Sequence, residues 1–403
     1  MKKFNLNEQM NNFLRDFDKF TEYLSEREVT IGKKTGFISP KFLFEMNSLI
    51  SIKQEGITTK SAELSYPLLH LFCNLAKSSR LFIEDAGKAG KIILKPTERI
   101  DNFKDLNITE KYISILEVLW MDCDFEKLQY QTYDYLDAHR AAEVLSVISQ
   151  QKPDEIFYLD KFMRYNSSSI ILYFYYFGIL DYKEYEKAES KEKGRFFEPD
   201  EIVINPLGLK IIKILNKKRN LELWNIPYRR ECGEWKFDFE EEFKLPFVNL
   251  FEKDILSNTL IRNLNKFTDG TYTFKISLDR STWAKIKLSS QHTLEDLHNS
   301  IQEVFDFDND HMYSFFMDGK AWSNNKFTCP YEEMGPYVDE VKIGELDLYK
   351  KQDFLYLFDY GDEWRFNVKV FDIDEEDKIT LLKPQIIESK GKVEQYPDFD
   401  DEW

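Results

Sequence analysis

Two histidines and two aspartates in the last third of the chain are the side chains best suited to chemistry. His298, His311, Asp359 and Asp362 combine imidazole and carboxylate groups, which can bind a metal ion or transfer protons as acid and base. A second interpretation gives each residue a structural task. Asp359 and Asp362 flank Gly361 in a tight turn, where short carboxylates accept hydrogen bonds from backbone N–H groups, and His311 follows a loop that ends a helix. We favour the structural interpretation.

Three aspartates at alternating positions raise the question of a calcium loop. Asp306, Asp308 and Asp310 have the right spacing, but an EF-hand also needs glycine at its sixth position, which is His311 here. The motifs GxxxxGK[ST], GxGxxG, HExxH and GxSxG do not occur in the sequence. We therefore expect no metal and no cofactor. A metal-dependent hydrolase centred on His311 and Asp362 is the remaining catalytic alternative.

The elements around these residues predict a small α+β domain. Residues 272–278 and 283–288 alternate apolar and polar side chains across a short turn, which predicts a hairpin. Thr293 is a helix cap, and the apolar residues that follow it lie on one helical face. Further strands are expected at 313–317, 354–358 and 364–371. The order β-β-α-β-β-β favours an antiparallel, β-grasp-like fold, because short turns can connect antiparallel neighbours.

Aromatic residues gather in the same segment. Trp364, Tyr360, Phe358 and Tyr313 either form an exposed surface for a partner or fill the core of the sheet. A core is the more common outcome. The exposure of Trp364 distinguishes the two alternatives.

Several short motifs of this segment recur in order in a known family. They are Trp283 with Lys285, Thr293-Leu294 with Leu297-His298, FDFDNDHMYSF at 305–315, LFDYGDEW at 357–364, and the tail IIESKGKVEQYPDFDDEW at 386–403. Because these motifs occur in the same order, the segment from about residue 272 to 403 resembles the plasmid pRiA4b ORF-3-like family. This family is also described as TnpR-like passenger proteins of transposable elements.

The resemblance implies a fold more than an activity. Members of the family occur on plasmids and transposable elements and have no established activity. Where the family usually has histidine two positions after the signature tryptophan, this chain has Phe366. That departure weakens any histidine-based metal or acid-base site that is carried over from the family.

The first 260 residues favour helices interrupted by two hairpins. A helix near 66–78 is followed by RLFIEDAGKAGKIILKP, and SSIILYFYYFGILDY is followed by GRFFEPDEIVINPLG, in which Asn205-Pro206-Leu207-Gly208 opens another helix. We interpret both as winged-helix-like units. The expected domains are thus 1–125 and 126–260, each with one such unit, and 270–403, the α+β domain.

The helix after the second hairpin offers a DNA-binding alternative. Its basic residues can contact phosphates in a winged-helix regulator; they are Lys210, Lys213, Lys217, Lys218 and Arg219. The formal net charge of −17 acts against nucleic-acid binding. A protein partner is therefore the favoured expectation.

Composition limits the remaining possibilities. The four cysteines lie far apart without a CxxC pair, which favours reduced, half-buried thiols. The most apolar run, residues 170–180, is about half the roughly 20 residues of a membrane-spanning helix, and we expect no membrane segment and a cytoplasmic location. We expect a non-enzymatic interaction protein, linked to mobile genetic elements or to defence against them. The oligomeric state is left open.

Overall fold

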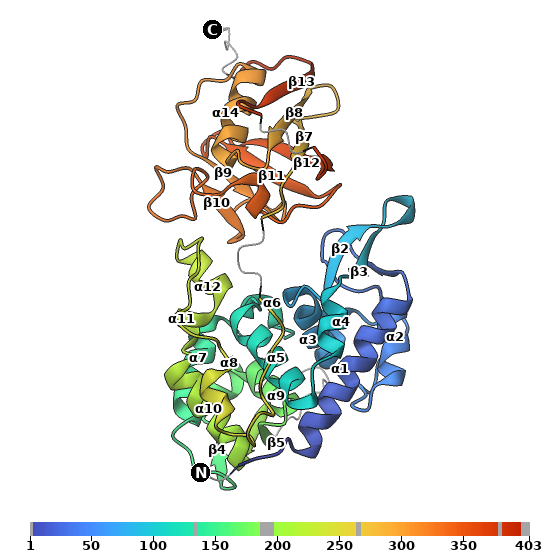
Figure 1. Cartoon of the computed structure of the whole chain (residues 1–403), viewed down its shortest axis with the longest axis vertical. Coiled ribbons are helices and arrows are strands. Elements are labelled where there is room, and N and C mark those ends of the chain that lie inside the picture. Colours follow the sequence, from blue (N-terminus) through green and yellow to red (C-terminus); the bar gives the residue numbers. More distant parts are fainter. Residues whose placement is uncertain (1–2, 132–134, 186–196, 263–266, 378–380, 396–403) are drawn as a thin grey trace, which may run out of the picture. The chain divides into compact units, whose positions relative to one another are not determined.

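The chain folds into two compact units of mixed helix and sheet. The computed structural model describes residues 3–131, 135–185, 197–262, 267–377 and 381–395 (Figure 1). Unit 1 comprises Met1–Tyr228 and Phe239–Arg262, and unit 2 comprises Arg229–Asp238 and Asn263–Trp403. Apart from residues 229–238, both expected N-terminal domains lie in unit 1, where their buried side chains form one continuous core.

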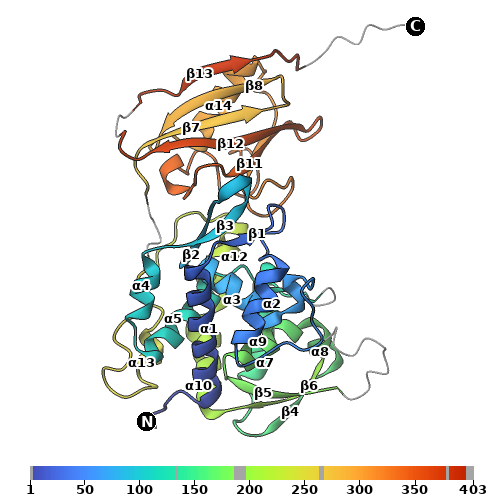
Figure 2. The same ribbon diagram turned by 90° about the vertical axis from the view of Figure 1, so that its right-hand side faces the viewer.

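The first half of unit 1 is a helical group closed by a hairpin. Its helices are α1 (Glu8–Glu26), α2 (Pro40–Leu49), α3 (Pro67–Ser78), α4 (Arg99–Lys104), α5 (Ile108–Met121) and α6 (Phe125–Leu128). The Ser39-Pro40 pair in the sequence predicts a helix start, and α2 begins at Pro40, because proline is well suited to the first helical position. Within the described residues, β1 (Val29–Ile31), β2 (Phe82–Ala86) and β3 (Ile92–Pro96) form an antiparallel sheet in the order β1-β3-β2 (Figure 2).

The second half of unit 1 repeats this order of elements. It contains α7 (Ala138–Ile148), β4 (Ile156–Tyr158), α8 (Lys161–Asn166), α9 (Ser168–Tyr176), β5 (Leu180–Glu184) and β6 (Pro199–Ile204), with its described strands in the order β4-β6-β5. The helices α10 (Pro206–Lys218), α11 (Leu221–Trp224), α12 (Ile226–Glu231) and α13 (Leu245–Val248) follow, and the division between the units falls within α12. Most side chains of α3 and of α9 are buried, and the two helices approach each other in the core.

In the described part of unit 2, seven strands form one antiparallel sheet in the order β10-β9-β11-β12-β7-β8-β13. The strands are β7 (Thr271–Ser277), β8 (Trp283–Ser289), β9 (Tyr313–Phe316), β10 (Lys326–Thr328), β11 (Asp353–Phe358), β12 (Trp364–Asp374) and β13 (Gln385–Lys390), and α14 (Leu294–Phe305) follows β8. Strands β10 and β13 add to the predicted order. The end of the family-like tail, residues 396–403, lies outside the described residues.

None of the helices in the described ranges combines the length and the apolar character needed to cross a membrane.

Candidate functional site

The signature residues of unit 2 meet where α14 packs on the sheet. Thr293 accepts a hydrogen bond from Asp296 N, so it caps α14 as expected, and the Asp296 carboxylate accepts from Thr293 N, which completes a capping box. One helical turn later His298 points into the core and is 1% exposed. Its ring stacks on the Tyr313 ring of β9, with centroids 3.5 Å apart and planes 2° from parallel.

A directed chain of hydrogen bonds holds the His298 ring. The Gln302 amide donates to the Tyr356 hydroxyl at 2.8 Å, and that hydroxyl lies 2.7 Å from His298 Nδ1. On the other side, His298 Nε2 lies 2.8 Å from Asn309 Oδ1. The consistent assignment is a neutral ring that donates from Nε2 to Asn309 and accepts from Tyr356 at Nδ1. His298 therefore joins the helix, the sheet and the 306–312 loop.

Burial makes this histidine sensitive to acid. It lowers the pKa of His298 from 6.5 to about 4, and the hydrogen bond with Asn309 opposes that shift only in part. In the unfolded chain the ring binds its proton nearer pH 6.5. The stability contributed by neutral His298 is therefore complete above about pH 6.5 and is lost as the pH falls toward 4, a loss of about 3 kcal/mol.

We expect the unfolding free energy of unit 2 to depend on pH through this residue. Denaturant-dependent hydrogen exchange of full-length protein at pH 7, 5.5 and 4 measures it. Asp and Glu residues also titrate near pH 4, so the informative quantity is the slope difference between wild type and His298→Gln, which cannot bind the proton. Equal slopes would contradict the prediction.

The Asp359 side chain holds the turn that follows β11. Asp359 adopts a φ of 56°, and its Oδ1 accepts hydrogen bonds from Gly361 N at 2.8 Å and Asp362 N at 3.3 Å. The other carboxylate oxygen lies 3.5 Å from His311 Nε2, and Asp310 Oδ1 is at the same distance. Gly361 and Asp362 are exposed. The Asp359 carboxylate therefore organises the turn, as the structural interpretation predicts.

A metal centre needs converging ligands. Across the described ranges of the chain, no group of three or more His, Cys, Asp or Glu side chains is arranged to hold a metal ion.

Trp364 belongs mainly to the core of unit 2. It is partly buried, and its ring packs edge-on against Phe307 with centroids 5.1 Å apart. Phe366, at the position where the family usually has histidine, is fully buried and packs against Phe305 and Phe307. This departure from the family therefore adds apolar packing where a polar ring would otherwise lie.

Trp283 lies apart from the signature turn. It is on β8, and β7 separates β8 from β12 in the sheet. The Lys275 and Lys285 ammonium groups lie 4.4 and 5.6 Å from the centre of its ring. The structure brings His298, Tyr313, His311 and Asp359 together and leaves Trp283 on another part of the sheet.

An aromatic surface, formed by Trp322 and Tyr360, lies at the turn, and the exposed residues Tyr331 and Met334 are in the loop after β10. The Tyr360 hydroxyl is 2.7 Å from Ser314 Oγ, and its ring meets the Trp322 ring edge-on at 5.0 Å. Trp322 Nε1 donates to Glu363 at 3.0 Å. Trp322, Tyr331 and Met334 are 50%, 87% and 62% exposed.

The sequence patterns did not identify Trp322, Tyr331 and Met334 as candidate binding residues. They lie in polar loops around β10, where no apolar periodicity draws attention to them. The available signal is a tryptophan within a loop of polar and small residues, DGKAWSNN, where core packing does not require it.

The basic residues after the second hairpin divide into two groups. Lys210, Lys213, Lys217 and Lys218 are exposed along α10. Arg219, which we expected on the same surface, is 1% exposed instead. Its guanidinium lies 4.1 Å from the Trp224 ring centre and bonds to Glu241 Oε1 and to the carbonyl oxygens of Lys218, Glu242 and Phe243. Arg219 is therefore a buried anchor of unit 1, because α10 ends at Lys218 and the chain turns inward there.

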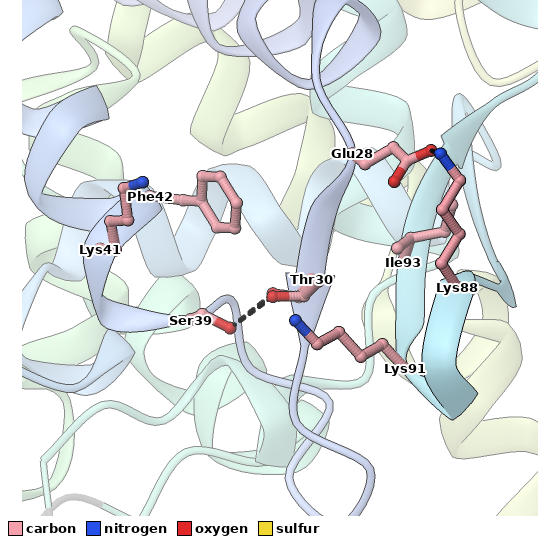
Figure 3. Close-up of a pocket in the computed structure, with 8 residues that line it drawn as sticks. All are labelled: Glu28, Thr30, Ser39, Lys41, Phe42, Lys88, Lys91 and Ile93. Atoms are coloured by element: carbon pink, nitrogen blue, oxygen red, sulfur yellow. Dashed lines mark hydrogen bonds and ion pairs between the residues drawn. The ribbon is translucent and has the colours of Figure 1, made fainter.

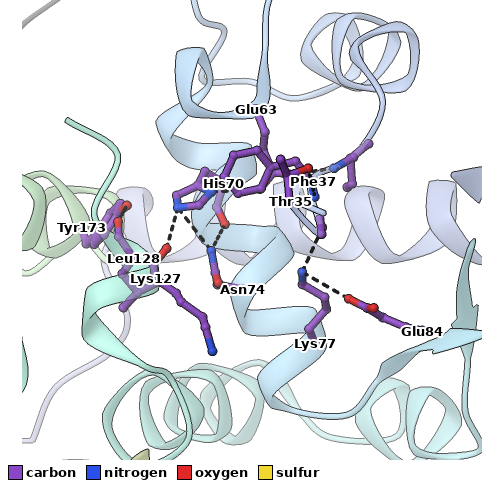
Figure 4. A network of polar contacts seen from close by, with 12 residues as sticks. Thr35, Phe37, Glu63, His70, Asn74, Lys77, Glu84, Lys127, Leu128 and Tyr173 are labelled. Atoms are coloured by element: carbon purple, nitrogen blue, oxygen red, sulfur yellow. Dashed lines mark hydrogen bonds and ion pairs between the residues drawn. The ribbon is translucent and has the colours of Figure 1, made fainter. Parts of the chain in front are cut away.

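A second buried histidine joins distant segments of unit 1 (Figure 4). His70 Nδ1 lies 2.9 Å from Glu63 Oε1, and Nε2 lies 2.8 Å from the carbonyl oxygen of Lys127. Glu63 also accepts from Ile38 N at 2.6 Å. Burial, reinforced by Glu63, raises the pKa of the neighbouring Cys73 thiol, which is fully buried. The thiol is thus protonated and inaccessible, and the group is a structural network.

Comparison with known proteins agrees with the C-terminal resemblance. Residues 270–397 match the family model described as plasmid pRiA4b ORF-3-like protein, which confirms the resemblance for this domain. A crystal structure described as a protein of unknown function, MM3350, from Methanosarcina mazei Go1 is 21% identical, with a TM-score of 0.25. That match covers 30% of this chain and 69% of the other. No curated protein matches the chain.

Proposed function

We propose that this chain is a non-enzymatic, cytoplasmic interaction protein whose C-terminal domain binds a protein partner. The observation that carries the proposal is the aromatic surface, where Trp322 is half exposed beside the signature turn. Tryptophan, tyrosine and methionine are enriched at protein interfaces, and tryptophan and tyrosine dominate their binding energy. The nearby His298 and Asp359 are already engaged in structural hydrogen bonds, which supports a binding role over a catalytic one.

The biological setting is proposed from the family alone. The matched family takes its name from a plasmid protein. Its other description, TnpR-like passenger proteins, associates the family with transposable elements. We propose that the chain serves as an accessory protein of such an element or of a defence against it.

We further propose a β-grasp-like fold for unit 2 and two winged-helix-like halves in unit 1. In support of the latter, α1-β1-α2-α3-β2-β3 and α7-β4-α8-α9-β5-β6 have the same order, with the same strand pairing. In DNA-binding proteins of this type the third helix reads the major groove. Here α3 and α9 are largely buried. This burial favours a scaffold over a reader of DNA sequence.

A second candidate, a DNA-binding regulator, rests on α10. Lys210, Lys213 and Lys217 follow an i, i+3, i+7 spacing, which lines one face of the helix, and all are exposed. That face can contact phosphates without a recognition helix.

The test compares tryptophan variants of the full chain. A partner captured by wild type in its native host is identified by mass spectrometry and purified, and its Kd is measured. We expect Trp322→Ala to weaken binding about thirty-fold, the effect of removing an interface hot spot. Trp283→Ala, which removes a half-buried tryptophan elsewhere on the sheet, is the matched control and should bind as wild type does.

Other outcomes would contradict the proposed surface. Equal affinity of the Trp322→Ala and wild-type proteins would remove the aromatic surface from the interaction. Capture of DNA without a specific protein, lost when Lys213 and Lys217 are changed to glutamate, would favour the DNA-binding candidate.

A further inference from the structure

A pocket opens in unit 1 between β1, the first turn of α2 and the β2–β3 hairpin (Figure 3). Its volume is about 440 Å³, within the range of small-molecule sites. Thr30 and Ser39 are among the residues that line it, with their hydroxyl oxygens 2.8 Å apart. We propose that this pocket binds a small molecule that carries a phosphate group and a flat ring, of the size of a mononucleotide.

Lysines from separate elements give the pocket its charge. Lys41 comes from α2, Lys88 from the turn of the hairpin, and Lys91 from the residue that precedes β3. The sole carboxylate among the lining residues is Glu28, so the lining carries a net charge of plus two. In a chain with a net charge of −17, such a local concentration of positive charge attracts an anion to this place.

The three ammonium groups differ in their present partners. Lys88 lies 3.7 Å from Glu28, and Lys41 lies 4.0 Å from Glu45. The Lys91 ammonium group makes no hydrogen bond or ion pair with any part of the chain that the structure describes, and Figure 3 shows it near the Thr30 side chain. A phosphate can therefore pair with Lys91 without breaking an existing ion pair.

The Ser39 hydroxyl adds to the preference for an anion. Ser39 precedes α2 at the capping position, but its hydroxyl donates to the carbonyl oxygen of Thr30 at 3.0 Å and makes no capping bond. The first turn of α2 consequently lacks its side-chain cap, and its partial positive charge is not offset there.

The remaining walls suit the rest of a nucleotide. Phe42 and Ile93 supply an apolar surface for a flat ring. Glu28, held by Lys88, supplies an acceptor for a hydroxyl or amino group of the ligand. A duplex is a poorer fit, because α3, which precedes the hairpin, is largely buried and cannot enter a groove.

The test is calorimetric titration of the full chain with AMP, GMP, CMP and UMP, followed by the nucleoside of the tightest binder. We expect one of the nucleotides to bind at least tenfold more tightly than its nucleoside. Lys91→Met should weaken that nucleotide about tenfold, since it removes a charge-assisted contact. Lys161→Met, which removes an exposed lysine of α8, is the charge-matched control and should leave the affinity unchanged.

Three results would overturn the proposal. The first is no saturable binding of any nucleotide up to about 10 mM, which is weaker than a built site provides. The second is equal weakening by Lys91→Met and Lys161→Met, which would show a nonspecific charge effect. The third is binding of a single-stranded oligonucleotide that the mononucleotides do not displace, which would assign the pocket to a nucleic-acid strand.

Discussion

Replacing His298 with alanine is expected to lower the unfolding free energy of unit 2 by about 4 kcal/mol. The change leaves a cavity under the Tyr313 ring, and buried side-chain truncations of this size cost about 2–5 kcal/mol. It also removes the partner of the Tyr356 hydroxyl and of Asn309 Oδ1 in a buried site. Denaturant-dependent hydrogen exchange, followed on peptides from β9 and β11, reports this loss in the full-length protein.

Two comparisons make the His298 prediction specific. His139→Ala removes an exposed histidine of α7 and should change stability by less than about 1 kcal/mol. Tyr356→Phe removes the hydroxyl that bonds to both His298 and Gln302, so its effect should not add to that of His298→Ala. A loss below about 1 kcal/mol for His298→Ala would contradict the assignment of the hydrogen-bond chain to unit 2 stability.

Gly208→Ala is expected to destabilise unit 1 by about 3 kcal/mol or more. A Cβ at this position would lie 2.0 Å from the carbonyl oxygen of Ile179, so the backbone itself must move. The helix cannot shift easily, because the Asn205 side chain accepts from Gly208 N at 2.8 Å and donates to the carbonyls of Gly178 and Ile179. Urea unfolding followed by far-ultraviolet circular dichroism measures the effect.

Whether Gly208→Ala lowers or raises the unfolding free energy shows whether packing or helix propensity dominates at this position. Alanine is favoured over glycine within a helix by about 1 kcal/mol, so propensity alone predicts a stabilised protein. Lys213→Ala, at an exposed position of the same helix, reports the propensity term and should change stability by less than about 0.5 kcal/mol. A higher midpoint for Gly208→Ala would show that the start of α10 is not tightly packed against Ile179.

Local patterns were sufficient where neighbouring residues determine the structure. The cap at Thr293, the proline start of α2 and the alternation along β7 and β8 could all be predicted, because caps and strand faces depend on residues close in sequence. The turn around Asp359 was predicted for the same reason. The ordered motifs of the C-terminal third also led to the family, which the match over residues 270–397 confirms.

Long-range packing decided the other features. Lys218 and Arg219 are adjacent and equally basic, yet one is exposed and the other is a buried anchor, because Arg219 meets the carbonyls of residues 242 and 243. Likewise, Trp364 packs against Phe307 whereas Trp322 is half exposed. The pocket brings Lys41 together with Lys88 and Lys91, which belong to a hairpin far along the chain.

The sequence by itself determined the local elements and the family of the last domain, because short-range backbone preferences and ordered motifs are written in consecutive residues. Tertiary structure alone decided which charged and aromatic side chains face solvent, since that depends on which distant segments cover them.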